Sequence, residues 1–446
     1  MVRLAVLLGS LVSWISKLTH VGAGATWPGE IALRISPEIL SSLSRNMRKG
    51  IILVAGTNGK TTTTLMIKRI LEANGDTVIH NASGANLLNG IVSALLTRES
   101  VDWGVFEVDE NALPRVLQCI PNPKVIILLN LFRDQLDRYG EVRAVAEKWQ
   151  VTLSRVSKQT QLIINADDPQ LAFIGKNMTH PVVRDFGLSD PSYYISRMQH
   201  ATDSIYCPSC GNRLTFAGVY YSHLGDWKCT KCRFTHPDLL WTSRDVVSPL
   251  EGIYNIYNSL AALSAGISVG IPTQSIRASL AGFKPAFGRM EELMYQGKHI
   301  TILLSKNPTG FNESLRTVCS SGKKGPMIIL LNDRIPDGTD VSWIWDVDFE
   351  ILDGYGYPVI LSGDRAYDMG VRMKYTRNSK LEAPLGLSSG RRRSSNKYQK
   401  FEVEKDLPKA LQLAVEKTHD KERLWVLATY SAMLDARKIL TGKKIL

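Results

Sequence analysis

The fold of this chain is constrained most by one glycine-rich segment, which reads Gly56-Thr57-Asn58-Gly59-Lys60-Thr61-Thr62-Thr63. The segment follows the apolar run 51–55 and leads into an amphipathic stretch, 60–74, so we expect a strand, a loop and a helix in succession. In such a turn, backbone N–H groups, the positive end of the helix and a lysine ammonium bind phosphate oxygens, while a hydroxyl binds Mg²⁺. The predicted nucleotide site therefore comprises Gly56, Thr57, Asn58, Gly59, Lys60, Thr61 and Thr62. We expect Lys60 to face the solvent and Thr61 to bind the metal.

Apolar runs alternate with helical patterns along the rest of the chain, in two series. The first series has runs at 105–106, 125–129 and 162–164, and the second has runs at 300–304, 327–331, 359–361 and 424–428. Because these runs are continuously apolar, both faces of each sheet should be covered, as in parallel α/β sheets. We therefore predict a helical segment at 1–48 packed on a central domain at 49–290, and a C-terminal α/β domain at 291–446. The Ser- and Arg-rich stretch 388–400 should form a solvated loop.

Length and charge narrow the function. The 446 residues, 44% of them hydrophobic, suffice for several cores, and no apolar stretch reaches the roughly 18 residues of a spanning helix. A formal net charge of +12 favours anionic partners such as nucleotides, nucleic acids or membrane phosphates. The uncharged run 4–16, followed by Ala23-Gly24-Ala25, has the outline of a secretory signal. Because a motif that needs cytosolic ATP begins about thirty residues later, we expect instead a helix that is buried or lies on a membrane surface.

Four of the six cysteines form two pairs, Cys207-Pro208-Ser209-Cys210 and Cys229-Thr230-Lys231-Cys232, with eighteen residues between them. Each pair offers two thiolates from one tight turn, and two such turns complete a tetrahedral site that suits Zn²⁺. Since protein fills all four positions, the predicted zinc is structural and lies in an insert at 201–236. We expect the other cysteines, Cys119 and Cys319, to be core residues, and His223 and His236 not to be ligands.

Further motifs follow in a fixed order. They are Phe106-Glu107-Val108-Asp109-Glu110, the stretch NLFRDQLDRYG at 130–140, Asn165-Ala166-Asp167-Asp168-Pro169, Tyr254-Asn255-Ile256-Tyr257-Asn258 and Gly288-Arg289-Met290-Glu291. Together with the glycine-rich segment, this set resembles the Mur ligase superfamily, whose members form amide bonds at the expense of ATP. The resemblance implies that Glu107 joins Thr61 as a Mg²⁺ ligand. It also implies that Asn165, Asn255, Asn258 and Arg289 bind ATP.

Two positions depart from the superfamily pattern. Gln135 stands where the superfamily has a histidine that assists a metal, so the number of Mg²⁺ ions stays open. Lys148 resembles a lysine that the superfamily carbamylates, although its spacing from Gly140 is one residue short. A surface lysine beside Glu147 is the alternative interpretation.

The C-terminal region departs further. Where the ligases carry D-Y-A-H-x-P, this chain reads SKNPTGFN at 305–312, so the usual amino-acid acceptor site is altered. Acidic groups punctuate aromatic residues in the stretch 332–346, which ends in DVSWIWD. With the zinc insert, this text looks like the MurT branch of the superfamily, the ligase-like subunits of lipid II isoglutaminyl synthases in Gram-positive bacteria.

That resemblance implies a Mur-ligase-like central P-loop ATPase domain with a parallel sheet and a zinc-ribbon insert, followed by a Rossmann-like α/β domain. The implied reaction amidates the α-carboxyl of D-isoglutamate in the lipid II stem peptide through an acyl phosphate, at the inner face of the cytoplasmic membrane. It needs ATP, Mg²⁺ and ammonia from a GatD-type glutamine amidotransferase subunit, with Lys60 and Glu107 as catalytic residues. The family lends an acidic residue to the Cys–His pair of that partner. Asp346 is our first candidate and Asp340 our second, and a strand-end or helix-cap aspartate is the alternative.

Two other functions stay open at this point. A folylpolyglutamate-type ligase explains the glycine-rich segment but not the zinc insert. A nucleic-acid-binding ATPase with a zinc ribbon explains the paired cysteines and the positive charge but not the later motifs, so we expect no nucleic acid partner.

Overall fold

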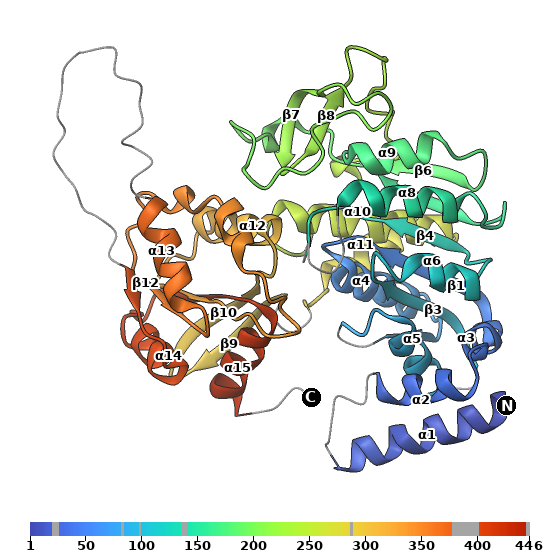
Figure 1. The fold of residues 1–446 in the computed structure, drawn as a ribbon, viewed down its shortest axis with the longest axis horizontal. Coiled ribbons are helices and arrows are strands. Elements are labelled where there is room, and N and C mark those ends of the chain that lie inside the picture. The colour runs from blue at the N-terminus through green and yellow to red at the C-terminus, as the bar shows by residue number, and fades with distance from the viewer. Residues whose placement is uncertain are drawn as a thin grey trace. The chain divides into compact units, whose positions relative to one another are not determined.

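The computed structural model describes residues 1–19, 26–81, 84–97, 100–134, 141–285, 289–376 and 401–442. Two compact units make up the chain, Met1–Ala286 and Phe287–Ile445. Each unit is built around one six-stranded sheet, and a separate two-stranded hairpin is present as well (Figure 1). The stretch 388–400, for which the sequence predicts a solvated loop, lies outside the described residues.

The first unit begins with three helices and continues as alternating strands and helices. Its helices are α1 (Val2–Thr19), α2 (Trp27–Ile35), α3 (Ile39–Leu43), α4 (Lys60–Ala73), α5 (Leu88–Leu95), α6 (Leu113–Cys119), α8 (Val142–Leu153), α9 (Pro169–Lys176), α10 (Ile253–Ser268) and α11 (Thr273–Ala281). Its strands are β1 (Met47–Ala55), β2 (Val78–His80), β3 (Val101–Val108), β4 (Val125–Leu128), β5 (Gln161–Asn165), β6 (Val182–Phe186), β7 (Thr215–Tyr221) and β8 (Leu224–Lys228). The main sheet has the parallel order β2-β3-β1-β4-β5-β6. Parallel strands bring their carboxyl ends to one edge, so the loops after β1, β3 and β4 lie together there.

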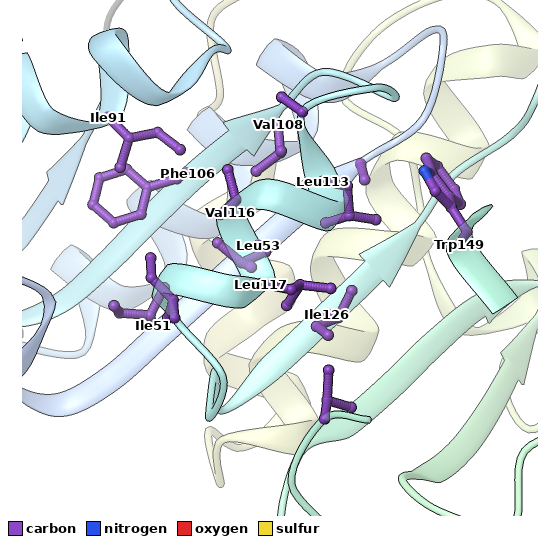
Figure 2. Close-up of a cluster of buried hydrophobic side chains, with 14 of the residues drawn as sticks. Ile51, Leu53, Ile91, Phe106, Val108, Leu113, Val116, Leu117, Ile126 and Trp149 are labelled. Carbon is purple, nitrogen blue, oxygen red and sulfur yellow. The ribbon is translucent and has the colours of Figure 1, made fainter. Parts of the chain in front are cut away.

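Both faces of this sheet are buried, which explains its unbroken apolar strands. In β1, Ile51 and Leu53 belong to a buried layer that includes residues of α5, α6 and α8, whereas Ile52 and Val54 belong to the layer of α4, α10 and α11. Figure 2 shows the first layer, which also contains Trp149. Burial of each such side chain contributes about 1.5–3 kcal/mol to stability. The predicted parallel α/β sheet is thereby confirmed.

The insert leaves the main sheet after β6. Its strands β7 and β8 form an antiparallel hairpin, and Ser222 adopts a positive φ of 51° in the turn between them. Tyr220 and Tyr221 of the hairpin are buried in the layer that α10 also lines, so the insert is packed on the first unit.

The second unit has the same kind of architecture. Its strands are β9 (Arg289–Tyr295), β10 (Lys298–Leu304), β11 (Met327–Leu330), β12 (Val359–Ser362), β13 (Phe401–Val403) and β14 (Arg423–Ala428). Its helices are α12 (Pro308–Ser320), η4 (Ser342–Asp346), η5 (Phe349–Leu352), α13 (Ala366–Thr376), α14 (Leu407–Glu416) and α15 (Tyr430–Thr441), of which η4 and η5 are 3₁₀ helices. The sheet order is β13-β12-β11-β14-β10-β9, and β9 alone pairs antiparallel. A two-residue turn joins β9 to β10, with positive φ at Gln296 and Gly297 as in a type I′ hairpin.

Every apolar run that predicts a strand is a strand in the structure. The sequence did not reveal β2, β6, β9, β13 or the hairpin, because β2 and β13 have only three residues and β6 and β9 mix polar with apolar residues. The segment 1–48, predicted to be helical, contains α1, α2 and α3. No helix within the described ranges is both long and apolar enough to cross a membrane.

Candidate functional site

The glycine-rich segment forms the loop between β1 and α4, and two of its residues must be glycine. Gly56 and Gly59 have φ values of 140° and 91°, which L-residues with side chains rarely adopt. A Cβ atom on Gly56 would lie 2.9 Å from Leu129 Cβ, and one on Gly59 would lie 2.2 Å from Asn258 Oδ1. Gly59 directly precedes α4, so backbone N–H groups at the start of that helix lie next to the loop. This geometry is the kind that binds phosphate.

The loop after β4 holds the glycine-rich loop in place. Asn130 Oδ1 accepts a hydrogen bond from Asn58 N at 2.8 Å, and Asn130 Nδ2 donates to Asn58 O at 3.1 Å. Thr57 is bracketed in a similar way, since its hydroxyl accepts from Phe132 N at 3.0 Å and donates to Phe132 O at 3.2 Å. Asn130 begins the NLFRDQLDRYG stretch, and this bracing role was not predicted from the sequence. The remainder of that stretch, from Gln135 to Gly140, lies outside the described residues.

Lys60 is buried, so the expectation that it faces the solvent is wrong. The residue is 7% exposed. Its Nζ donates to Gly56 O at 2.5 Å and to Thr57 O at 3.1 Å, and it pairs with Glu110 Oε2 at 3.2 Å. Lys60 is the first residue of α4. Its side chain folds back toward the loop, where Gly56 O and Thr57 O accept its hydrogen bonds. Glu110, which ends the Phe106–Glu110 motif, is a site residue that sequence reasoning missed.

Thr61 and Glu107 come together at the ends of α4 and β3. Thr61 Oγ1 donates to Glu107 Oε2 at 2.5 Å, and Glu107 is 1% exposed. The other carboxylate oxygen, Oε1, accepts a hydrogen bond from Gly84 N at 2.9 Å. The side chain of Asn81 donates to Glu107 O through Nδ2 and accepts from Glu107 N through Oδ1. Adjacent ligands of an octahedral Mg²⁺ with bonds of 2.0–2.1 Å lie roughly 2.9 Å apart. The two oxygens are therefore close enough to share one Mg²⁺ after a small separation.

The other predicted ATP-binding residues of the first unit occupy two places. Asn255 and Asn258 lie on α10, where Asn258 Nδ2 donates to Asn255 Oδ1 at 3.1 Å and Asn258 Oδ1 accepts from Thr63 Oγ1 at 3.3 Å. They therefore adjoin the glycine-rich loop. Asn165 is fully buried at the end of β5, and its Nδ2 donates to Leu129 O at 2.8 Å. Thr62 is buried on α4.

The four paired cysteines converge, although they come from two separate turns. Their sulfur atoms all lie within 4.8 Å of one another, with Cys207 Sγ 3.6 Å from Cys232 Sγ and Cys210 Sγ 3.5 Å from Cys229 Sγ. A tetrahedral Zn²⁺ with bonds of 2.3 Å has ligand atoms roughly 3.8 Å apart. The four sulfur atoms therefore fit such an ion. They would fill all four of its positions and leave none open for a substrate. A hydrogen bond from the backbone of Phe234 lowers the pKa of Cys232, whereas burial raises the pKa of Cys207, and a bound dication would deprotonate both.

The histidines of the insert are not part of the cysteine cluster, and they contact the loop that follows β5. His236 Nε2 lies 2.8 Å from Asp167 Oδ1, and Tyr257 of α10 donates to Asp167 Oδ2 at 2.5 Å. Burial lowers the pKa of His236, but the hydrogen bond and charge of Asp167 outweigh burial, so its pKa is raised. His223 Nε2 lies 3.3 Å from Asp168 Oδ2. The Asn165–Pro169 motif, which follows β5, thus links the insert to α10, and the sequence did not reveal this link.

In the second unit, the two candidate aspartates differ in their surroundings. Asp340 is exposed, and its carboxylate accepts hydrogen bonds from the backbone N and the hydroxyl of Ser342, the first residue of η4, at 2.8 and 2.9 Å. Asp346 is the last residue of η4 and is half-buried. Arg289 begins β9 and is also half-buried.

Lys148 lies in the first unit, on the exposed side of α8, next to an ion pair between Arg143 and Glu147.

Comparisons with known proteins agree with this arrangement. Residues 54–266 match the family model described as the Mur ligase middle domain, and residues 304–433 match the model described as MurT ligase C-terminal. In fold, the chain is similar to a pseudomurein peptide ligase type C from Methanothermus fervidus, with a TM-score of 0.66 and 22% identity over 90% of this chain and 80% of that one. It is also similar to the MurF ligase from Thermotoga maritima in complex with ADP, with a TM-score of 0.60 and 15% identity over 92% and 83%. The predicted Mur-ligase-like fold is confirmed.

Curated relatives are more similar in sequence. The subunit MurT of the lipid II isoglutaminyl synthase (glutamine-hydrolyzing) of Streptococcus pneumoniae is 31% identical over 96% of this chain and 95% of its own length. The protein of the same name from Staphylococcus aureus strain COL is 32% identical over 81% and 84%. Because the similarity runs over nearly the full length of both chains, this chain belongs to the MurT family of Mur-ligase-like proteins.

Proposed function

We propose that this chain is the ATP-dependent ligase subunit of a lipid II isoglutaminyl synthase and amidates the α-carboxyl of D-isoglutamate in the lipid II stem peptide. The observation that carries the proposal is the similarity to the MurT subunits of the two relatives, which covers nearly the full length of both chains for the Streptococcus pneumoniae protein. The buried Lys60 and Glu107, with the half-buried Thr61, lie beside the glycine-rich loop and support the proposal, because an ATP-dependent ligase needs a phosphate site with a metal position.

The reaction divides into two balanced steps. In the first, an oxygen of the substrate carboxylate attacks the γ-phosphorus of ATP, and ADP leaves. In the second, ammonia attacks the carbonyl carbon of the acyl phosphate, inorganic phosphate leaves with the C–O bond electrons, and the nitrogen loses one proton. Activation is needed because a carboxylate is a poor electrophile and its oxygen a poor leaving group.

The residues of the first unit have distinct roles in the first step. Loop N–H groups and the start of α4 bind the phosphates, and the Lys60 ammonium stabilises the charge that develops between the β and γ phosphates. Glu110 orients that ammonium, because Lys60 Nζ and Glu110 Oε2 lie 3.2 Å apart and both side chains are buried. Thr61 and Glu107 would hold Mg²⁺, which would neutralise further charge on the phosphate oxygens when bound.

In this proposal the ammonia comes from a second protein. Four cysteines of the chain form the predicted zinc site, and the two that remain are Cys119 and Cys319. Burial raises the pKa of both remaining thiols, whereas a glutaminase nucleophile needs a lowered pKa. We therefore propose a GatD-type glutamine amidotransferase partner. Asp346, with Asp340 as the alternative, completes the Cys–His pair of that partner in this proposal.

The proposed substrate sets the place of action. Lipid II is anchored in a bilayer and ATP is cytosolic, so the subunit acts at the inner face of the cytoplasmic membrane in this proposal. In the same proposal, zinc is structural, because the four thiolates complete its coordination.

The test is co-purification with a glutaminase subunit, followed by mass spectrometry of lipid II for the acid-to-amide change. We expect the product with glutamine when the partner is present, and with an ammonium salt when it is absent. ATP turnover that depends on folate and glutamate, or on DNA or RNA, with unchanged lipid II, would refute the proposal in favour of the other functions that the sequence left open.

A further inference from the structure

The outer face of α1 is apolar and exposed. Met1, Leu4, Leu7, Leu8, Leu11 and Trp14 recur at the three- and four-residue spacing that places side chains on one face of a helix, and all of them are exposed. Leu7 is 68% exposed and Trp14 60%. Trp27, at the start of the neighbouring helix α2, is 70% exposed. Exposed apolar side chains that gather on one helix face in this way mark an interaction surface.

The inner face of the same helix fixes its orientation on the first unit. Ala5 is fully buried, and a Cβ on Gly9 would lie 2.7 Å from Leu96 Cδ1, so small residues let α1 approach the body of the unit closely. The hydroxyl of Ser10 donates to Leu96 O at 3.5 Å. Figure 1 shows α1 lying along α2 at the margin of the first unit. Because the small residues lie on the inner face of α1, the leucines lie on its outer face.

The charges around this face are positive. Helix α1 contains no acidic residue, and Arg3 lies on the margin of the apolar face. Residues 1–50 contain six Lys and Arg side chains and two Glu, a surplus of four positive charges. Basic residues that flank an apolar helix face attract anionic phospholipids, and tryptophan rings prefer the depth of the headgroups.

We propose that α1 docks the first unit onto an anionic phospholipid bilayer, with the helix parallel to the surface and its outer face inserted among the acyl chains. At 18 residues the helix is about 27 Å long, enough to spread its leucines over several lipids. Leu7 and Leu11 lie at the centre of the inserted face, and Arg3 reaches the phosphates at its margin. The inference deepens the proposed function, on which it rests for its purpose, because docking brings the ligase site to a lipid-anchored substrate.

Vesicle flotation of the full chain in complex with its glutaminase partner tests this inference. The vesicles contain either phosphatidylcholine alone or phosphatidylcholine with phosphatidylglycerol. We expect the wild type to bind the anionic vesicles more tightly than the vesicles of phosphatidylcholine alone. The double variant L7E/L11E should bind the anionic vesicles at least about tenfold more weakly than the wild type, because two inserted apolar side chains become charged. The matched control is Val247→Glu, since Val247 is 86% exposed in the same unit. Unchanged thermal midpoints check that the variants are folded.

Amidation assays separate this inference from the proposed function. The double variant should lose amidation of lipid II in vesicles and keep amidation of a water-soluble lipid II analogue with a short chain. Equal vesicle binding by wild type and double variant, or no binding by the wild type, overturns the inference. The face is a protein interface if the wild type does not bind vesicles and the double variant loses the glutaminase partner or a self-associated form. That result also overturns the inference. If the wild type binds vesicles but amidates neither substrate, the proposed function fails and the docking stands.

Discussion

Replacement of Gly59 by alanine separates two costs that the structure predicts for the glycine-rich loop. The first cost is backbone strain, because the φ of 91° is unfavourable for a residue with a Cβ by about 1–2 kcal/mol. The second is a steric one, since the new Cβ would lie 2.2 Å from Asn258 Oδ1. Asn258 must then move and release its hydrogen bonds to Thr63 and Asn255, at about 1 kcal/mol each. The expected total is about 3–4 kcal/mol.

Gly75→Ala is the matched control. Gly75 has nearly the same φ, 89°, and a Cβ there would meet no atom within 4 Å, so only the strain of about 1–2 kcal/mol should appear. Thermal and urea unfolding measure both variants, and calorimetric titration with ATP measures the loss of affinity expected for Gly59→Ala alone. On an Asn258→Ala background, the cost of Gly59→Ala should fall to that of Gly75→Ala. Equal destabilisation by the two alanines, or full additivity with Asn258→Ala, would refute the reasoning.

Further predictions concern the catalytic, metal and buried ionisable residues. Lys60→Ala should abolish ATP-dependent amidation and also cost about 3 kcal/mol, because Glu110 is left buried without its cation; unfolding assays should show that adding Glu110→Gln restores stability but not turnover. Cys229→Ser should release the predicted zinc and destabilise the insert while ATP binding persists, and metal analysis that finds the wild-type content would contradict this. Asp346→Asn should reduce glutamine-dependent amidation and spare ammonium-dependent amidation, whereas equal loss with both nitrogen sources would place Asp346 in the ligase site. Burial raises the pKa of Asp185 to about 6, so its ionised form costs stability as pH rises from about 4 through 6. Asp185→Asn should therefore be more stable than the wild type by about 1–2 kcal/mol at pH 8, with the gap closing as pH falls through 6 toward 4, and a constant gap in urea unfolding would disprove the assignment.

The sequence by itself determined the architecture and the chemical classes of the sites. Continuous apolar runs such as 51–55 predicted buried parallel strands, because only a strand covered on both faces needs apolar residues at every position. Gly56 and Gly59 predicted the phosphate-binding loop, because that motif is made of a few consecutive residues that end at Lys60. The cysteine pairs predicted a zinc site, because each pair supplies two thiolates from four consecutive residues.

The tertiary structure alone decided which distant residues meet. Lys60 is buried against Glu110, fifty residues later, and Asn58 is bracketed by Asn130, because parallel strands deliver those side chains to one edge of the sheet. The contact of His236 with Asp167 depends on where the insert folds back, which no local pattern encodes. The uncharged run 4–16 predicted a helix that is buried or lies on a membrane surface, but only packing decided which side of α1 is buried. Small residues let one side approach the protein closely, and the leucines were left outside.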